Sequence, residues 1–247
     1  MKTLVVLPTY NEADNIGGIL ERVLGHGIFD VLVVDDNSQD GTREIVRGLM
    51  DRHSNVQMLE RPGKMGLGTA YTTGFKWGLE HGYDCMMEMD SDFSHNPDDM
   101  PRFVEAVNGG AHLVIGSRYI GGTISVIGWE FRRLLLSRFG NIYASHILGI
   151  PLTDLTSGFR AYTSRALRGI DLESIHSEGY SFQIEMAYYV WCQGLRVEEI
   201  PIVFTERAQG SSKMSKSIVH EAVKLPWRLR VLNMLGRINC TPAPDKD

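Results

Sequence analysis

The sequence has few cysteines, no long apolar run and no excess of positive charge. Its 3 cysteines, Cys85, Cys192 and Cys240, are widely spaced and form no CxxC pair, which favours a reducing compartment over a disulfide framework or a zinc site. No uninterrupted apolar run approaches the ~18 residues of a transmembrane helix. The apolar N-terminal stretch stops at Pro8, too early for a signal-peptide core. We therefore expect a cytoplasmic protein, at most peripheral on the cytosolic face of a membrane.

Several common enzyme motifs are also missing. The first apolar strand is not followed by GxGxxG, which argues against a dinucleotide-binding dehydrogenase. Neither the Walker A pattern nor GxSxG occurs, which argues against a P-loop kinase and against a hydrolase with a nucleophile elbow. A net charge of -5 gives no support for nucleic acid as the main partner.

Apolar strands and amphipathic helices alternate along the chain. The 247 residues are 43% hydrophobic and 22% charged, as is ordinary for a soluble globular protein. The alternation predicts an α/β fold, with a mostly parallel sheet and helices on both faces. The expected strands cover residues 4–7, 31–34, 56–59, 85–89, 113–116 and 200–204, and later helices are expected at 130–148 and 183–193.

The fourth expected strand ends in two carboxylates, Asp90 and Asp92. Ligands of open α/β sheets bind at the carboxyl ends of the strands. Mg²⁺ is usually held there by one or two carboxylates together with substrate phosphates. A cation site is therefore predicted, although an isolated pair of this kind is also compatible with helix capping or plain solvation.

Acids follow two other strands as well: Glu12 follows the first, and Asp35 and Asp36 follow the second. Acids that converge from different strands would bind ribose hydroxyls, base edges and a metal, as a nucleotide diphosphate carrier requires. Helix capping is an equal explanation for Asp40 and a weaker one for Asp36.

Several motifs, in order along the chain, carry a family resemblance. PTYNE, VVDDNSQDGT, MDSDFSH and GSRY follow successive strands and resemble the inverting GT-A glycosyltransferases that use nucleotide-activated sugars. GSRYIGG, RRLLLS, DLTSGFRAY and ERAQGSSKMS further resemble the polyprenyl-phosphate (dolichyl-phosphate) mannose synthases, over about residues 3–216. The resemblance implies a GT-A fold, GDP-mannose as donor, a polyprenyl (dolichyl) phosphate as acceptor, and Mg²⁺ or Mn²⁺ as cofactor.

The same resemblance implies roles for individual residues. The metal ligands would be Asp90 and Asp92, and the acceptor phosphate would contact Arg118, Arg133 and Ser137. The catalytic residues would be Asp92, Arg118 and Arg133. The nucleotide-sugar site would comprise Pro8, Tyr10, Glu12, Asp36, Asp90, Ser91, Asp92, Arg118, Arg207 and Lys213. Some relatives carry Gln where this chain has Ser94, which leaves the role of Ser94 open.

Chemistry supports phosphate contacts for the basic residues, because Arg presents a planar fork to phosphate oxygens and Lys a point charge. Surface salt bridges are the alternative, and for Arg133 the two are equally plausible.

The expected reaction transfers mannose from GDP-mannose to a polyprenyl phosphate with inversion. The first rival is transfer of glucose or another hexose from a UDP-sugar to a lipid phosphate or a glycan, where Asp154 would serve as base for a glycan hydroxyl. The second is a non-catalytic subunit that binds nucleotide sugar.

We predict a single GT-A domain of residues 1–214 that is followed by a C-terminal tail. Apolar residues recur at helical spacing in a basic tail of residues 215–240, with Pro226 expected to kink or restart the helix. We expect this tail to lie in a membrane interface, with residues 130–148 as the other wall of a lipid entrance. The alternative is that the apolar stripe, Ile218, Ala222, Leu225, Leu229 and Leu232, packs on the protein's own core or on a partner helix. A small membrane-anchoring subunit stays open as a partner. Residues 207–216 are predicted to form a mobile loop, and residues 241–247 a disordered end. We expect residues 208–217 to become ordered when the donor binds; the alternative is a permanently flexible connector to the tail.

Overall fold

The computed structural model describes residues 1–206, 216–238 and 240, with the backbone alone for 216–220. The strands are β1 Thr3–Thr9, β2 Phe29–Asp35, β3 Val56–Glu60, β4 Cys85–Glu88, β5 Leu113–Ser117, β6 Val126–Ile127, β7 Arg160–Thr163, β8 Val197–Pro201 and β9 Phe204–Thr205. The α-helices are α1 Ala13–Gly25, α2 Thr42–Met50, α3 Leu67–Glu80, α4 Met100–Asn108, α5 Phe131–Leu148, α6 Ser164–Arg168, α7 Tyr180–Cys192 and α8 Lys216–Met234. Short 3-10 helices cover Pro97–Asp99 and Ile120–Gly122.

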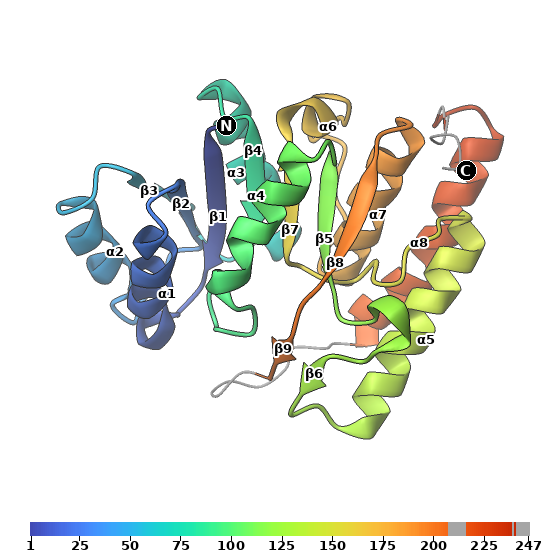
Figure 1. Cartoon of the computed structure of the whole chain (residues 1–247), viewed down its shortest axis with the longest axis horizontal. Coiled ribbons are helices and arrows are strands. Elements are labelled where there is room, and N and C mark those ends of the chain that lie inside the picture. Colours follow the sequence, from blue (N-terminus) through green and yellow to red (C-terminus); the bar gives the residue numbers. More distant parts are fainter. Residues whose placement is uncertain (207–215, 239, 241–247) are drawn as a thin grey trace.

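In the described part of the chain, seven strands form the main sheet, in the order β3-β2-β1-β4-β7-β5-β8 (Figure 1). The pairs β1–β2, β1–β4, β2–β3 and β5–β8 are parallel. β7 runs antiparallel to both of its neighbours, β4 and β5. The predicted mostly parallel sheet is therefore confirmed. The segment 153–159 leads directly into this antiparallel strand, which begins at Arg160.

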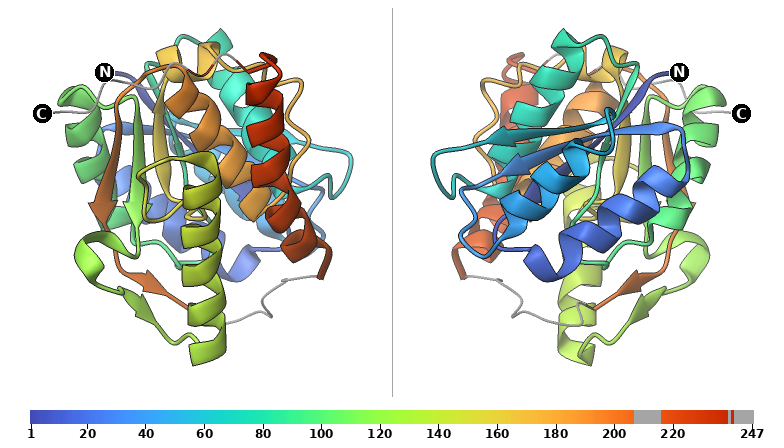
Figure 2. Two further views of the ribbon diagram at one scale, coloured as in Figure 1. Left: turned by 90° about the vertical axis from the view of Figure 1, so that its right-hand side faces the viewer. Right: turned by 90° about the vertical axis from the view of Figure 1, so that its left-hand side faces the viewer.

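Helices cover both faces of this sheet, as the sequence predicts (Figures 1 and 2). Alternate residues of β1 divide between two cores because successive strand side chains point to opposite faces. Leu4 and Val6 belong to the core formed with α3 and α7. Val5 and Leu7 belong to the core formed with α1, α2 and α4. Burial on both faces explains why the first strands are continuous apolar runs.

A smaller layer lies beside the carboxyl ends of the strands. β6 pairs in parallel with β9, and α5 follows β6 (Figure 2). α8 packs against both α5 and α7. Its Leu225 and Leu229 are buried in the core. The tail thus packs on the protein's own core through these two residues, and the helix continues across Pro226 instead of ending there.

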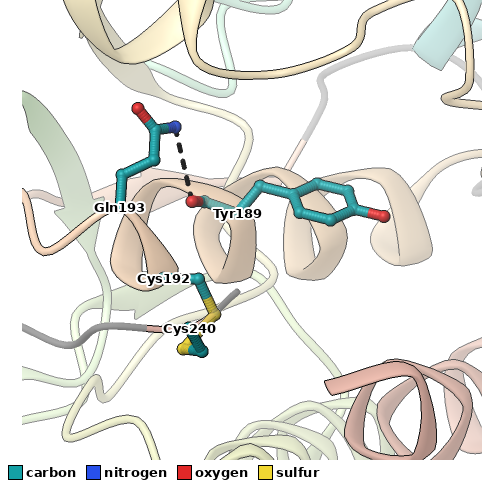
Figure 3. Close-up of a disulfide and its surroundings, with 4 residues drawn as sticks. All are labelled: Tyr189, Cys192, Gln193 and Cys240. Atoms are coloured by element: carbon teal, nitrogen blue, oxygen red, sulfur yellow. Dashed lines mark hydrogen bonds between the residues drawn. A yellow bond between two sulfur atoms is a disulfide. The ribbon is translucent and has the colours of Figure 1, made fainter. Parts of the chain in front are cut away.

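A disulfide joins Cys192, at the end of α7, to Cys240 (Figure 3). The expectation that the cysteines form no disulfide is therefore wrong for this pair. The pairing follows from the packing of α8 on α7, which returns the chain to the end of α7. Sequence spacing gave no signal of this contact because the two residues are 48 positions apart. Cys85 is a buried free thiol.

No helix among the described residues is both long and apolar enough to cross a membrane.

Candidate active site

A pocket of about 180 Å³ opens at the carboxyl ends of β1, β2 and β4. Seven residues predicted for the nucleotide-sugar site line it together: Pro8, Tyr10, Glu12, Asp36, Asp90, Ser91 and Asp92. The sequence analysis did not select the remaining lining residues, Thr9, Lys64, Gly66, Leu67 and Ala70. Most of these come from the loop after β3 and the start of α3, where the glycine-rich stretch 63–68 was the available signal.

The Asp90–Asp92 segment is held from several sides. The Ser91 hydroxyl donates to the Pro8 carbonyl at 3.0 Å, which ties the segment to the end of β1. Asp92 is buried, and its Oδ1 accepts from the Ser94 backbone N–H at 2.9 Å. Phe93 between them adopts a left-handed φ of 60° and closes the turn. Contacts within the protein therefore hold the backbone of this segment and the Asp92 side chain in place.

Tyr71 lies beneath this segment, 3.5 Å from Asp90 Oδ1 through its hydroxyl. Burial, together with the charges of Asp90, Glu88 and Asp92, raises the pKa of Tyr71 well above its ordinary value. The hydroxyl therefore stays protonated and serves as a hydrogen-bond donor to Asp90.

The donor set at this end of the pocket suits a hard divalent cation. Asp90 and Asp92 supply oxygen ligands alone, and among the described residues no three His, Cys, Asp or Glu side chains are placed so that they could hold a metal ion together. Two carboxylates cannot fill six coordination positions, so phosphate oxygens and waters would supply the rest, which is the usual arrangement for Mg²⁺. The residues present thus fit a cation that binds together with a diphosphate.

Asp36 supports the pocket wall as well as lining it. Arg61 is buried and donates through Nε to Asp36 Oδ1 at 2.5 Å. The Met65 backbone N–H donates to Asp36 Oδ2 at 3.1 Å. Because both carboxylate oxygens hold the loop after β3, a nucleoside would share Asp36 with these donors. Asp35 instead turns inward and accepts from Thr9 and Ser38.

Arg118 forms a buried ion pair with Asp154. Its Nε and Nη2 donate to the two Asp154 oxygens at 2.7 Å each, and Nη2 also donates to Thr156 at 2.8 Å. Burial raises the pKa of Asp154, but the charge and hydrogen bonds of Arg118 outweigh it and leave that pKa below its ordinary value. Asp154 is therefore an anchor for Arg118 and a poor proton acceptor. Arg118 Nη1 is the guanidinium nitrogen with no acceptor among the described residues.

Arg160 fixes the loop that carries Asp154. This arginine is fully buried and donates to the carbonyls of Leu155, Ser157 and Gln183, each at 2.7 Å. A guanidinium provides five donors in a rigid fork, so one side chain can satisfy several carbonyls at once. The loop 153–159 is thereby tied to β7 and α7.

Two of the predicted acceptor residues, Arg118 and Arg133, lie against the ring of Trp129. The third, Ser137, is bonded to Tyr119, whose ring centre lies 5.4 Å from the Arg118 guanidinium. The Arg133 guanidinium lies 4.1 Å from the Trp129 ring centre, and that of Arg118 lies 5.3 Å from it. Arg133 Nη1 donates to Glu206 at 2.8 Å, while Ser137 accepts from the Tyr119 hydroxyl at 2.8 Å. We call Arg118, Trp129, Arg133 and Ser137 the basic cluster. Two of its N–H groups, Trp129 Nε1 and Arg133 Nε, are buried without an acceptor among the described residues.

Phe204 of β9 connects the basic cluster with the carboxylate pair. Its ring lies edge-on to Trp129 at 5.3 Å and to His95 at 5.3 Å. His95 Nδ1 is in turn 3.4 Å from the Asp90 backbone nitrogen, and Thr205 donates to the Ser94 carbonyl at 3.1 Å. The carboxylate pair of Asp90 and Asp92 and the basic cluster therefore adjoin one another. Arg207 and Lys213, also predicted for the donor site, lie outside the described residues, as does most of the loop expected to order over the donor.

The chain belongs to glycosyl transferase family 2, whose model matches residues 4–170. It is similar to the polyprenol monophosphomannose synthase of Mycolicibacterium smegmatis, with 45% identity over 226 residues, covering 90% of this chain and 84% of the relative. It is also similar to the undecaprenyl-phosphate mannosyltransferase of Micrococcus luteus, with 46% identity over 225 residues, covering 90% of this chain and 91% of the relative. The predicted membership of this class of glycosyltransferases is confirmed.

The fold has a counterpart among solved structures. The glucosyl-3-phosphoglycerate synthase of Mycobacterium tuberculosis, in complex with Mn²⁺ and UDP-glucose, matches with a TM-score of 0.64. The match covers 99% of this chain and 80% of that chain, at 19% identity. At this identity the likeness concerns the fold alone, and it confirms the predicted GT-A architecture.

Proposed function

We propose that this chain transfers mannose from GDP-mannose to a polyprenyl phosphate, with inversion at the sugar. The observation that carries the proposal is the adjacency of two sites of opposite charge, linked by Phe204. The carboxylate pair suits a cation and a nucleoside diphosphate, and the basic cluster suits an anionic acceptor. The names of the two relatives at 45% and 46% identity support mannose and a polyprenyl phosphate as the transferred group and the acceptor.

The chemistry requires little from a protein base. An acceptor phosphate is already anionic near neutral pH, and one of its oxygens forms the new bond to the anomeric carbon. The bond from that carbon to the donor diphosphate breaks, and the leaving diphosphate carries away the electron pair. Asp90 and Asp92 would hold a divalent cation, which would supply charge stabilisation to that leaving group. The protein's own contribution is to position the two anions and to offset their charge.

The state of Asp154 favours a phosphate acceptor over a glycan hydroxyl. A hydroxyl needs a carboxylate that accepts its proton. Both oxygens of Asp154 are occupied by Arg118, and its pKa lies below the ordinary value because of that pairing, in spite of burial. Asp154, which the sequence suggested as the base for transfer to a glycan hydroxyl, is therefore already paired with Arg118.

Glu206 occupies Arg133 in the present arrangement through the 2.8 Å ion pair. We infer that the acceptor phosphate replaces this carboxylate. The exchange gives Arg133 Nε, and Trp129 Nε1 beside it, the anionic acceptor that both lack among the described residues. Phosphate also carries more charge than one carboxylate, which favours the exchange.

A membrane surface is the proposed location of the reaction. α5 and α8 lie side by side, joined by hydrogen bonds from Tyr143 to the Val223 carbonyl at 2.9 Å and from Trp227 to Tyr143 at 3.0 Å. These two helices expose the large apolar residues Phe131, Leu135, Leu136, Phe139, Ile142, Val223, Trp227, Val231 and Met234, and Leu235 directly after α8 is exposed as well. Arg132, Lys224 and Arg228 are exposed on the same helices. This composition suits an anionic lipid interface on the cytosolic side.

The apolar surface and the basic cluster share one helix. Arg133 lies on α5 three residues before the exposed Leu136, and residues at this spacing are neighbours on a helix surface. A lipid phosphate held by Arg133 would therefore start its hydrocarbon chain beside the apolar surface. This continuity supports a lipid-linked acceptor over a soluble one.

A transfer assay with the purified chain tests the proposal. Radiolabelled GDP-mannose, Mn²⁺ and a polyprenyl phosphate in detergent should give a labelled lipid that extracts into organic solvent. UDP-glucose should give far less product under the same conditions. Product from UDP-glucose alone would assign the chain to the hexose-transfer alternative, and no product from either donor would contradict turnover by this chain.

A further inference from the structure

Lys64 stands apart from the other charged groups of the nucleotide pocket. Among the described residues that line the pocket, it is the one cation, whereas Glu12, Asp36, Asp90 and Asp92 are carboxylates. No carboxylate of the described residues lies within ion-pair distance of its ammonium. Its closest partner is the face of the Tyr10 ring, whose centre lies 4.8 Å away. Lys64 therefore brings an uncommitted positive charge to the pocket rim.

The loop that carries Lys64 is fixed on both sides of this residue. Arg61 donates to Asp36, Thr69 and the Gly66 carbonyl. The Gly68 backbone N–H donates to Glu178 at 3.0 Å. Gly66 has a φ of 104°, and a Cβ there would collide with the Glu178 carboxylate. The backbone on either side is anchored, so the long side chain of Lys64 is the adjustable part of this wall.

The strand order places Lys64 at the nucleoside end of a bound nucleotide. Asp90 and Asp92 follow β4, whereas Lys64 follows β3, and β1 and β2 lie between these strands. Three strand spacings of about 4.8 Å amount to roughly 14 Å. A diphosphate bridged by a cation to the carboxylate pair would extend its ribose across β1 and β2. Its base would then lie near the loop 61–67, where Leu67 and Ala70 also line the pocket.

A lysine ammonium donates hydrogen bonds and accepts none, so it discriminates among bases. Guanine presents two acceptors on one edge, O6 and N7, whereas adenine has an amino donor at the corresponding position 6. We propose that Lys64 is a specificity-determining residue that donates to the O6/N7 edge of guanine, an inference that rests on the proposed function. Tyr10 holds the ammonium at the rim until the base arrives.

Calorimetric binding of four nucleotides in the presence of Mn²⁺ tests this role. GDP and inosine diphosphate share the O6/N7 edge, ADP lacks the O6 acceptor, and UDP reports on the shared ribose and diphosphate. The wild-type chain should prefer GDP and inosine diphosphate to ADP. Lys64→Met keeps the length of the side chain and should weaken both of these ligands roughly 10- to 100-fold, while leaving ADP nearly unchanged. Lys64→Arg should restore most of the preference.

Lys76→Met is the matched control, because Lys76 lies on α3 outside the pocket and pairs with Glu173 at 2.5 Å. It should bind all four nucleotides as the wild type does. An equal loss of affinity for GDP, ADP and UDP in Lys64→Met would assign Lys64 to the phosphates and overturn the proposal. Unchanged affinities, or a loss of affinity confined to GDP, would overturn it too. A wild-type chain without base preference would contradict the donor assignment as well. Wild-type preference retained in Lys64→Met would refute the lysine's role alone.

Discussion

Buried pairing determines what each charged residue of the site is able to do. Asp154 and Arg118 are both fully enclosed and satisfy each other through two hydrogen bonds of 2.7 Å. Arg118 is consequently presented in one orientation, with Nη1 as the nitrogen left for a phosphate. The sequence indicated a phosphate-binding arginine, but nothing in its local pattern indicated that Asp154, 36 positions away, is the partner.

Replacing Asp154 with Asn should destabilise the fold strongly. It leaves the Arg118 guanidinium buried without a counter-charge, at a cost of about 3–5 kcal/mol. Urea unfolding monitored by circular dichroism measures this change, and Asp51→Asn on the exposed end of α2 is the control. A loss below about 1 kcal/mol, the size of a surface pair, would contradict the buried ion pair.

The same pair predicts a direction for the pH dependence. The pKa of Asp154 is lower in the folded protein than its ordinary value of 3.8, because Arg118 outweighs the effect of burial. The folded state therefore binds the proton less readily than the unfolded chain. The stabilisation is complete above about pH 4 and is lost as the pH falls through the folded pKa. Asp154→Asn should remove this acid-dependent component from the unfolding curves.

Asp92 and Asp90 provide the direct test of the cation site. Asp92→Ala should abolish the Mn²⁺-dependent part of GDP-mannose binding, because the diphosphate loses the cation that bridges it to the protein. Calorimetry with and without Mn²⁺ measures this effect, and the thermal unfolding midpoint checks that the variant is folded. Unchanged Mn²⁺-dependent affinity in Asp92→Ala would remove Asp92 from the site.

At the scale of elements, the sequence predicted the N-terminal half well. Apart from the partly exposed edge strand β3, the strands up to β5 are largely apolar and buried on both faces. Acids after β1, β2 and β4 line one pocket because parallel strands end at the same edge. β7 was missed because it is a strand of four residues that begins with a charged arginine. Arg160 is tolerated in the sheet because it donates hydrogen bonds to three backbone carbonyls. Those of Leu155 and Ser157 lie in the loop before β7, and that of Gln183 lies on α7. Such contacts between distant segments produce no periodic pattern in the sequence, so periodicity could not predict this strand.

The α5–α8 surface gives an element-scale prediction for membrane binding. Phe139 on α5 is 66% exposed, so its transfer into lipid would contribute about 2 kcal/mol, or roughly 30-fold in affinity. Phe139→Ser should weaken binding to anionic liposomes by that factor in a sedimentation assay. Ile28→Ser, at an exposed apolar residue between α1 and β2, is the matched control and should bind as the wild type does. Equal binding by both variants would place the membrane contact elsewhere.

At the scale of the whole molecule, an acidic region and a basic region are formed by different elements and come into contact through β9. Acidic residues gather at the ends of β1, β2 and β4, while the basic cluster is built from β5, α5 and the segment before α5. The overall charge of -5 conceals this division, so composition alone could not have indicated an anionic acceptor. β9 unites the two environments through Phe204, a contact that required the folded chain.

The most direct measurement of the central claim compares two acceptors that differ by one phosphate. Purified chain, GDP-mannose and Mn²⁺ are incubated either with a polyprenyl phosphate or with the corresponding polyprenol, and the mannosyl lipid is identified by mass spectrometry and by the anomeric coupling in its NMR spectrum. The account predicts β-linked product from the phosphate and none above background from the alcohol, because the phosphate is both the anion held by the basic cluster and the nucleophile. Comparable transfer to the polyprenol, or an α-linked product, would contradict it.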